Sequence, residues 1–315
     1  QDLRDRALKA FMKLKYTMGD AFKQDISLTL FLTDMLIKPI LLYLSDFWGC
    51  LKLPRNNPIE NMNMMIYKHL LGVQKQTMNV GVLLELGRVP LSLSAMKMSI
   101  KNWDRIRRGQ ANELLITSYR EAVEKNLKWV FTIKETLEVN GMLNSFLGYD
   151  INGLFPVYRT LFQRLSDQFH QCAFENIRNE GCKLRTYSLF KTEIGMEKYL
   201  VNIKNIEKRS QVTKFRLSNH ILETEERHKK IPKELRCCHF CLQCVESEIH
   251  FLFHCPAYAH LRERWLEEAA ENVLLYNVEQ KLYFFLSKMN QETVQFITSS
   301  LELRQFLLEK HKTHV

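Results

Sequence analysis

The sequence predicts a mainly α fold with a small metal-binding module near its C-terminal end. Apolar residues recur at helical spacing along nearly all of the 315 residues, whereas alternating strand patterns are scarce. Gly and Pro residues divide this pattern into segments of ordinary helix length. Five of the eight cysteines fall within residues 237–255, a clustering that is typical of a metal site.

The N-terminal part, residues 1–143, is expected to be multi-helical. A stripe from Leu3 to Met18 predicts the first helix, which ends at Gly19. Residues 26–48 are apolar on nearly every face, which predicts a central buried helix with a kink or break at Pro39. The pattern then predicts helices over 59–71, over 78–109 in two parts divided at Gly87 and Pro90, and over one long segment from Tyr119 to Gly141.

Residues 144–156 contain Gly, Asn and Pro and are the best candidate for a linker. The regions expected after it are a helical basic region (157–224), the metal module (225–275) and a C-terminal helical tail (276–315). Within them, helical patterning covers 157–180, 196–222, 257–275 and 291–310. Strands are expected only in a hairpin at the metal module.

The module reads RCCHFCLQCVESEIHFLFHCPAY. Zinc takes four N or S ligands at tetrahedral corners, and a Cys-x2-Cys turn followed by a His and a Cys supplies them. Two ligand sets fit the spacing: Cys238, Cys241, His250 and Cys255, or Cys241, Cys244, His250 and Cys255. The first is preferred because it leaves a longer loop, residues 242–249, to fold over the metal.

A zinc ion is the cofactor that this module predicts. Free cysteines are often simply buried, which is the ordinary alternative, but five within one short segment favour metal binding. All four ligands can come from protein, so a structural site is expected rather than a catalytic one. Cys255 directly precedes Pro256, and Pro suits the first turn of a helix, where amide N–H groups favour a thiolate.

The formal net charge is +10, and much of the excess precedes the module. Residues 181–236 contain fourteen Lys or Arg against seven Glu. Such segments are usually solvated helix faces, but this one runs directly into the metal module, which favours contact with nucleic-acid phosphates. The candidate contacts are Lys214, Arg216, Lys229, Lys230, Lys233 and Arg236. Tyr187 and Phe190 could stack on bases, although a place in the core is the favoured role.

Three stretches of the chain form a distinctive set: ILLYLSDFWG from Ile40, LLGVQKQTMNVGVLLELGRVPL from Leu70, and the segment from Arg236 through Cys255-Pro256. Together they resemble the C-terminal third of the reverse transcriptase polyprotein of non-LTR retrotransposons, in the jockey-like broad group. The resemblance covers about residues 1–270. One departure is that Glu225-Glu226-Arg227 lacks the Gly of the family's Glu-x-Gly-Arg pattern, and the extra Cys237 and Cys244 blur the ligand register.

The resemblance implies a polymerase thumb and connection at the N-terminal end and a CCHC zinc knuckle with ligands Cys238, Cys241, His250 and Cys255. The implied function is non-catalytic binding of element RNA or target DNA for target-primed reverse transcription, together with the rest of the polyprotein. The alternative is a helical protein-interaction or scaffold remnant in which zinc only stabilises the fold. Intact endonuclease and palm regions upstream would favour the first.

The chain alone is not expected to be an enzyme. Polymerases position two metal ions with palm carboxylates, in this family an Asp-Asp turn, and the sequence contains no Asp-Asp pair. The most apolar run, Met35 to Leu44, is too short to span a bilayer, so no membrane partner is expected. Cysteines in a reduced state and the lack of a secretory signal predict an intracellular protein, nuclear or cytoplasmic. Because it begins at Gln, we expect it to be part of something longer.

Overall fold

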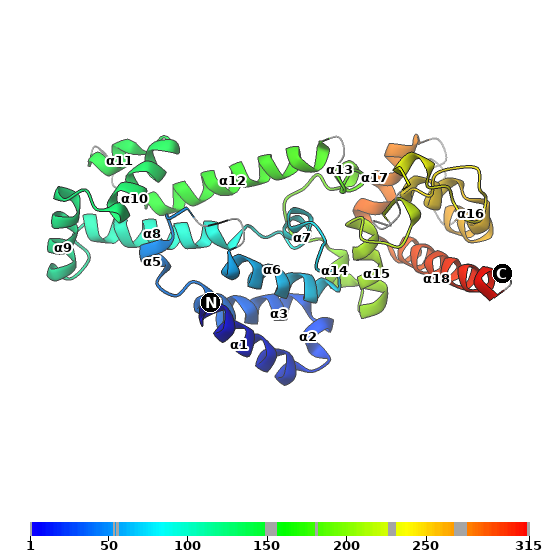
Figure 1. Ribbon diagram of the computed structural model, residues 1–315, viewed down its shortest axis with the longest axis horizontal. Coiled ribbons are helices and arrows are strands. Elements are labelled where there is room, and N and C mark those ends of the chain that lie inside the picture. The colour runs from blue at the N-terminus through cyan, green and yellow to red at the C-terminus, as the bar shows by residue number, and fades with distance from the viewer. Residues whose placement is uncertain are drawn as a thin grey trace. The chain divides into compact units, whose positions relative to one another are not determined.

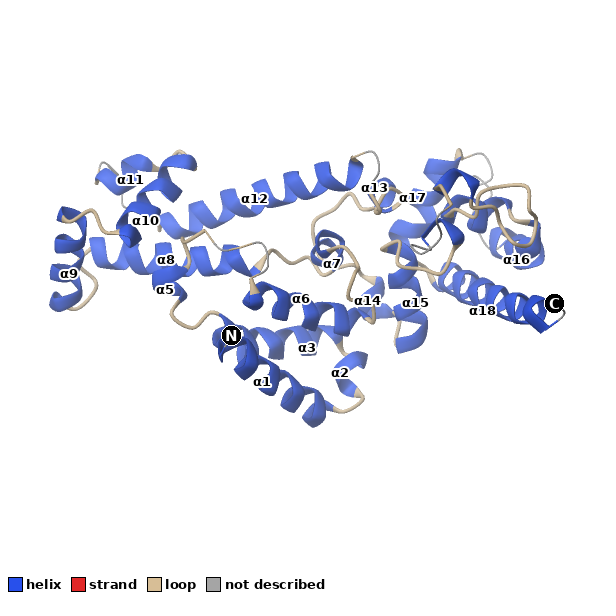
Figure 2. Ribbon diagram, viewed as in Figure 1, coloured by secondary structure: helices blue, strands red, loops and turns tan. Residues whose placement is uncertain are grey.

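The computed structural model describes residues 2–52, 54, 57–148, 156–179, 182–225, 231–267 and 276–313. Their regular secondary structure is helical (Figure 2), and two isolated β-bridges occur outside the helices. The predicted mainly α fold is therefore confirmed. Within the described ranges, none of the helices is long and apolar enough to cross a membrane.

The chain forms two compact units, each assembled from separate segments. Unit 1 consists of Gln1–Gly19, Leu28–Ile66 and Arg88–Ala173. Its helices, most of which are labelled in Figure 1, are α1 (Asp2–Met18), most of α3 (Ile26–Leu32), the π-helix η1 (Thr33–Ile37), α4 (Lys38–Leu41), α5 (Ser45–Trp48), most of α6 (Pro58–Leu71), α8 (Leu91–Arg107), α9 (Glu113–Glu124), α10 (Lys128–Val139), α11 (Leu143–Leu147) and most of α12 (Val157–Arg178).

Unit 2 consists of Asp20–Ser27, Tyr67–Gly87 and Phe174–Val315. Its elements are α2 (Ala21–Gln24), α7 (Asn79–Glu85), α13 (Tyr187–Phe190), α14 (Tyr199–Asn202), α15 (Ile206–Arg216), η2 (Glu223–Glu225), η3 (Lys233–Leu235), the π-helix η4 (His250–His254), η5 (Pro256–Tyr258), α16 (Ala259–Glu267), α17 (Val278–Lys288) and α18 (Gln291–Thr313).

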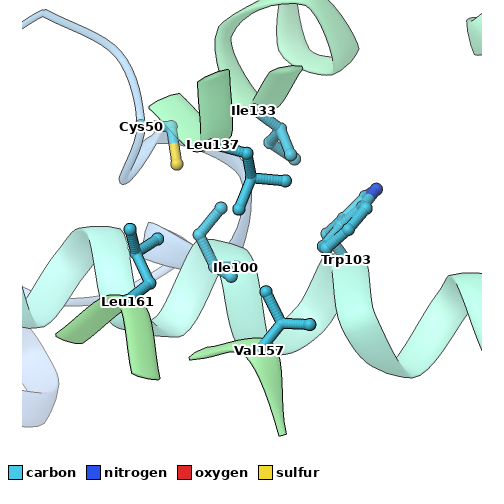
Figure 3. Close-up of a cluster of buried hydrophobic side chains, with 7 residues drawn as sticks. All are labelled: Cys50, Ile100, Trp103, Ile133, Leu137, Val157 and Leu161. Carbon is cyan, nitrogen blue, oxygen red and sulfur yellow. The ribbon is translucent and has the colours of Figure 1, made fainter. Parts of the chain in front are cut away.

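The core of unit 1 joins helices α8, α10 and α12 (Figure 3). Ile100 and Trp103 on α8 pack with Ile133 and Leu137 on α10, and the cluster is completed by Cys50, Val157 and Leu161. Burying each large apolar side chain stabilises the fold by about 1.5–3 kcal/mol. Because α12 begins inside this core, most of it, up to Ala173, belongs to unit 1.

The segment 26–48 breaks near Pro39 as predicted, but it is not a central buried helix. Proline lacks an N–H donor, and the π-helical turn η1 interrupts the α-helical ladder directly before α4, where Pro39 lies in the first turn. Only one side of the segment is buried. Its exposed large apolar side chains are Leu28, Phe31, Met35, Leu36, Tyr43, Leu44 and Phe47.

The predicted long helix from Tyr119 to Gly141 is wrong, because the chain forms α9 and α10 instead. Asn126 has a φ of +49°, a left-handed conformation that Asn tolerates better than most residues. The amide of Leu127 donates to the carbonyl of Ala122, which closes the end of α9. The single hydrophobic stripe in the sequence therefore belongs to two successive helices.

The consecutive domains expected from the sequence do not coincide with the two units. The expected linker 144–156 begins inside α11, its residues 149–155 lie outside the described residues, and the unit boundary falls within α12 instead. The predicted helix 196–222 is in fact α14 and α15 with a break between them. Helix α17 lies in the expected tail but had no helix predicted for it.

Gly87 fixes one close approach inside unit 2. Its φ is +61°, and a Cβ at this position would lie 2.4 Å from the backbone nitrogen of Met196. Leu86 and Met196 form one of the two β-bridges, and the amide of Glu197 donates to the carbonyl of Glu85 over 3.0 Å. The positive φ and this close approach explain why a glycine stands at the end of the Glu85-Leu86-Gly87 stretch.

Candidate metal centre

Four side chains from the metal module converge in unit 2. The possible ligand atoms of Cys238, Cys241, His250 and Cys255 all lie within 4.8 Å of one another. The Sγ atoms of Cys238 and Cys255 are 3.7 Å apart, and Cys241 Sγ lies 3.4 Å from His250 Nε2. Cys238, His250 and Cys255 are buried and Cys241 is half-buried. This cluster has the composition and the spacing to hold one metal ion.

A tight turn presents the first two cysteines. The amide of Leu242 donates to the carbonyl of Cys238, and the amide of Cys238 donates to the carbonyl of Cys244. Leu242 adopts a φ of +56°, so the chain reverses sharply after Cys241. The bridge between Cys237 and Val245 is the single paired position of the expected hairpin among the residues described.

The other two ligands lie on either side of a π-helical turn. His250 starts η4, and Cys255 directly follows it as the N-cap of η5, with Pro256 in the first turn. A hydrogen bond from Cys238, together with one from the Ala257 amide, lowers the pKa of Cys255 although burial alone would raise it. The expectation that Cys255 occupies a position that favours the thiolate agrees with this geometry.

Two of the other ligands, Cys238 and His250, have raised pKa values. The hydrogen bond to Cys255 and burial raise the pKa of Cys238 to about 12. The neighbouring thiols, first of all Cys238, also raise the pKa of His250, although burial would lower it. Metal ligands must be deprotonated, so a bound ion and protons compete for this set of atoms.

Buried groups fix the metal module to the helices of unit 2. Arg262 of α16 donates from Nε to the carbonyl of Leu252 over 2.7 Å and from Nη2 to the carbonyl of Cys255 over 2.7 Å. The rings of Phe251 and Tyr258 pack with centroids 4.9 Å apart, and Phe251 also contacts Phe215 of α15. The π-helical turn between the ligands is thus held from both sides.

A buried ion pair connects the loop between the ligands to the C-terminal helix. Arg304 of α18 donates to both carboxylate oxygens of Glu246 over 2.8 and 2.6 Å, and the amide of Glu223 donates to the same carboxylate. Glu246 is fully buried and Arg304 is 2% exposed. The module is therefore integrated into unit 2 and depends on α18 for one of its charge partners.

Glu248 forms a second anchor two residues further along. Its carboxylate accepts from Arg185 Nη2 over 2.9 Å and lies 3.1 Å from His220 Nε2. Burial would raise the pKa of Glu248, but His220 and Arg185 lower it to about 2. Glu246 and Glu248 are buried, whereas the residues that alternate with them, Val245, Ser247 and Ile249, are half-buried, so both carboxylates lie on the inner side of the loop.

Cys244 and Cys237 are exposed and stand outside the cluster. The structure thus brings together the ligand set that we preferred, Cys238, Cys241, His250 and Cys255, and not the set that contains Cys244. The longer loop that motivated this choice is the one that carries Glu246 and Glu248.

Arg216 does not fit the predicted role as a phosphate contact. Its side chain is fully buried, donates from Nε to Glu85 over 2.7 Å and lies 2.7 Å from Glu197 through Nη2. The carboxylate of Glu85 also accepts from the hydroxyl groups of Tyr187 and Tyr199, over 2.7 and 2.6 Å. The guanidinium has no access to a phosphate here, so we correct its role to a structural one.

Several other basic residues of the segment 181–236 also have internal partners. Arg236 donates to the backbone carbonyls of Ile231 and Thr224 over 2.9 and 3.0 Å, which ties the start of the module to η2. Lys183 and Arg185 both pair with the buried carboxylate of Glu225. Many of the basic side chains that suggested nucleic-acid binding therefore pair with carboxylates or donate to backbone carbonyls within unit 2.

Lys214 is the one predicted contact whose side chain the described residues place near an open surface. It is half-buried and lines a pocket of about 400 Å³ with Lys23, Arg209 and Ser210, between α15 and the end of α6. Lys229 and Lys230 lie outside the described residues, as does the side chain of Lys233 in η3. Their predicted contacts stay predictions.

Tyr187 and Phe190 are core residues, as favoured, since they are 0% and 3% exposed. Sequence reasoning missed Glu85, which receives four hydrogen-bond or ion-pair contacts from Tyr187, Tyr199 and Arg216. The available signal was a single acidic residue within the apolar run VGVLLELG, because a charge among apolar neighbours needs a buried partner.

Comparison with known proteins gives no relative: no protein-family model, no curated protein and no solved structure matches the chain.

Proposed function

We propose that this chain is the zinc-containing, nucleic-acid-binding C-terminal portion of a non-LTR retrotransposon reverse transcriptase, without catalytic activity of its own. The observation that carries the proposal is the convergence of Cys238, Cys241, His250 and Cys255. These are the four residues that the resemblance implies as the CCHC ligands.

Zinc is the ion that this ligand set suits. Tetrahedral coordination with Zn–S bonds of about 2.3 Å and Zn–N bonds of about 2.0–2.1 Å requires ligand atoms roughly 3.5–3.8 Å apart. The separations of 3.7 Å between Cys238 and Cys255 and 3.4 Å between Cys241 and His250 agree with this requirement. Thiolate-rich sites favour zinc over magnesium or calcium, which prefer oxygen ligands. Four protein ligands leave no position for a reactive water, which supports a structural role.

Binding of nucleic acid rests on the net charge of +10 and on the lysines that remain on the surface of unit 2. Lys214 and Lys23 line the pocket beside α15. Lys198 and Lys204, which precede α15 in the sequence, are exposed. Contacts of this kind hold phosphates and carry little sequence information. Element RNA or target DNA would be bound mainly through its backbone.

One observation favours the alternative of a scaffold or protein-interaction remnant. Lys183, Arg185 and Arg216 use their charges on buried carboxylates, so the basic segment serves folding to a large extent. In this alternative zinc stabilises the fold and the surface carries no affinity for phosphates. Binding measurements decide between the two.

The test is binding of single-stranded RNA and of duplex DNA as a function of salt. Each phosphate contact contributes about 0.7–0.9 to the slope of log affinity against log salt. Replacing Lys23 and Lys214 together with Ala should weaken binding for all sequences and reduce this slope by about 1.4–1.8. The triple change of Lys229, Lys230 and Lys233 to Ala tests the contacts predicted from the sequence in the same way.

The matched control replaces Lys9 and Lys13, exposed on α1, with Ala and removes the same charge. If the control weakens binding as much as the Lys23 and Lys214 pair does, the affinity depends on the net charge of the chain and not on this particular surface. Failure of the parent chain to bind either nucleic acid at low salt would favour the scaffold alternative. The parent chain should also incorporate no nucleotide on a primed template, because it has no Asp-Asp pair.

A further inference from the structure

A row of basic residues runs along one side of α8 in unit 1. Lys97, Lys101 and Arg105 follow one another at four-residue intervals, so they lie on the same side of the helix, about 6 Å apart along its axis. Lys101 and Arg105 are exposed, and Lys97 is half-buried. Neither the metal centre nor the lysines of unit 2 account for this row.

The first turns of α12 place two aromatic rings beside the row. The two helices meet in the core of unit 1 (Figure 3), which sets their neighbouring residues side by side. Lys97 Nζ lies 4.3 Å from the centre of the Phe162 ring, and Lys101 Nζ lies 5.9 Å from the centre of the Tyr158 ring. A cation over an aromatic face is attracted by the ring's electrons, so both ammonium groups are held near α12.

Arg159 adds a cation from α12 itself. Its side chain is exposed, its guanidinium lies 6.0 Å from the centre of the Tyr158 ring, and its Nε donates to the Tyr158 hydroxyl over 3.3 Å. This hydrogen bond, together with the charges of Arg159, Lys101 and Lys97, lowers the pKa of Tyr158 below its ordinary value. Three cations from two helices therefore act on one hydroxyl group.

Within the part of the chain that the structure describes, no carboxylate neutralises these charges. Lys97, Lys101 and Arg159 form no ion pair there, and the side chain of Arg105 donates to the neutral Oδ1 of Asn102 over 3.1 Å. The basic segment 181–236 of unit 2 differs, because many of its cations pair with buried carboxylates. The row on α8 keeps its positive charge.

Two acidic side chains of neighbouring elements are engaged elsewhere. Asp34 of η1 pairs with Arg88 and with Lys38. Glu60 of α6 accepts from the amides of the first two residues of α8, over 3.2 and 3.1 Å. A carboxylate at a helix N-terminus stabilises the helix dipole, so Glu60 has a structural role in unit 1.

An aromatic ring positions a cation without cancelling its charge. A carboxylate partner would neutralise an ammonium group, whereas a ring leaves its N–H donors able to bind another acceptor. Cations held in this way lose less conformational freedom when they bind an anion. Evenly spaced cations suit a polyanion with repeated charges better than a single phosphate. Because the cations lie over the rings, the rings serve the cations and not nucleic-acid bases.

We propose that the face formed by Lys97, Lys101, Tyr158, Arg159 and Phe162 binds the phosphate backbone of a nucleic-acid strand, with the two rings holding the cations in place. The choice of a nucleic acid among polyanions rests on the proposed function. Phosphate contacts carry little sequence information. This face therefore binds a strand irrespective of its bases.

The experiment measures binding of a labelled single-stranded RNA to the full chain as a function of salt. The double variant Lys101→Ala with Arg159→Ala should weaken binding by about tenfold at low salt and reduce the slope of log affinity against log salt by about 1.4, since it removes two contacts of about 0.7 each. The matched control, Lys9→Ala with Lys13→Ala on α1, removes the same charge and should change affinity much less. Equal losses in the two variants would overturn the face as a binding site.

Two substitutions at one position test the role of the ring. Tyr158→Leu keeps an apolar side chain against the core but no longer holds Lys101 and Arg159, so it should weaken RNA binding by about threefold. Tyr158→Phe keeps the ring and should bind within about twofold of the parent. Thermal unfolding checks that both variants are folded. Parent-like affinity in Tyr158→Leu would overturn the positioning role of the ring.

Other ligands test the choice of a nucleic-acid backbone. An abasic strand of the same length should show the same loss in the double variant, and a loss confined to the strand with bases would overturn backbone binding. Phosphatidylserine vesicles and a polyglutamate peptide are the competing polyanions. If the double variant binds either of them more weakly while its RNA binding is unchanged, the assignment of a nucleic acid is overturned.

The same titrations separate this inference from the proposed function. RNA binding that is unaffected by the Lys101 and Arg159 variant but weakened in the Lys23 and Lys214 variant overturns this face and leaves the proposed function standing. The opposite result supports this face and removes the lysines of unit 2 as contacts. Absence of RNA binding by the parent chain at low salt overturns both.

Discussion

Two clusters in unit 2 hold charged or polar groups away from water, and they differ in how their members are spaced along the chain. The metal-site residues all lie between Cys238 and Cys255. In the other cluster, Glu85 and Arg216 are 131 residues apart and meet only when α7 packs against α15. A local cluster can organise around one ion as it folds, whereas the distant pair depends on the completed fold. The two should therefore respond to different perturbations.

The largest expected effect comes from losing the metal. Cys241→Ser removes a residue common to both ligand sets, and metal binding at structural zinc sites contributes on the order of 10 kcal/mol or more. The variant should retain no zinc by elemental analysis and lose hydrogen-exchange protection over 231–258. The helices around Trp103 in unit 1 should keep theirs. Equal loss of protection in both units would show that the centre supports the whole chain and would remove the contrast.

Arg216→Met tests the distant pair. It leaves Glu85 buried without its charge partner, which should destabilise the fold by about 3–5 kcal/mol in urea denaturation. Adding Glu85→Gln removes the uncompensated charge and should restore part of this loss. Zinc content at neutral pH should stay at the parent level as long as the variant is folded. A loss of less than about 1 kcal/mol would mean that the carboxylate finds another partner, contrary to our account.

Gly87→Ala sharpens the comparison by disturbing the backbone that carries Glu85. The positive φ and the contact with Met196 should lower the free energy of unfolding of the variant by about 1–3 kcal/mol or more. Gly109 also has a positive φ but has open space around it, so Gly109→Ala serves as the control for the φ effect alone. Equal losses in thermal denaturation would indicate that the close approach contributes nothing.

The smallest expected effect is the contribution of Glu85 to the loss of folding stability at acid pH. Burial would raise its pKa, but the Arg216 guanidinium and the Tyr199 and Tyr187 hydroxyl groups lower it below the ordinary value. A lowered folded-state pKa contributes stability above the unfolded pKa of about 4.3, and this contribution is lost as pH falls below it. Acid also protonates metal ligands, so the comparison uses Glu85→Gln, whose stability should fall less steeply from pH 5 to pH 3. Identical slopes would contradict the assignment.

The sequence predicted those features that depend on short spacing. The metal ligands, the helix α1, the division at Gly87 and Pro90 and the break near Pro39 all follow from residues a few positions apart. Features set by distant contacts were missed. Arg216 looked like a surface cation because nothing nearby in the sequence reveals its pairing with Glu85, and the stripe from Tyr119 to Gly141 did not reveal the left-handed Asn126. The units, which draw on three segments each, could not follow from a linear division.

Metal content in two single variants tests the central claim most directly. Cys238→Ser and Cys244→Ser each remove one cysteine, and the two residues pair through their backbones across the same turn, so the variants form a matched pair. We predict that Cys238→Ser loses its zinc on gentle, reducing purification, while Cys244→Ser retains one zinc per chain as the parent does. Retention in Cys238→Ser with loss in Cys244→Ser would contradict the ligand set that the structure brings together. Zinc-free parent protein would contradict the metal centre itself.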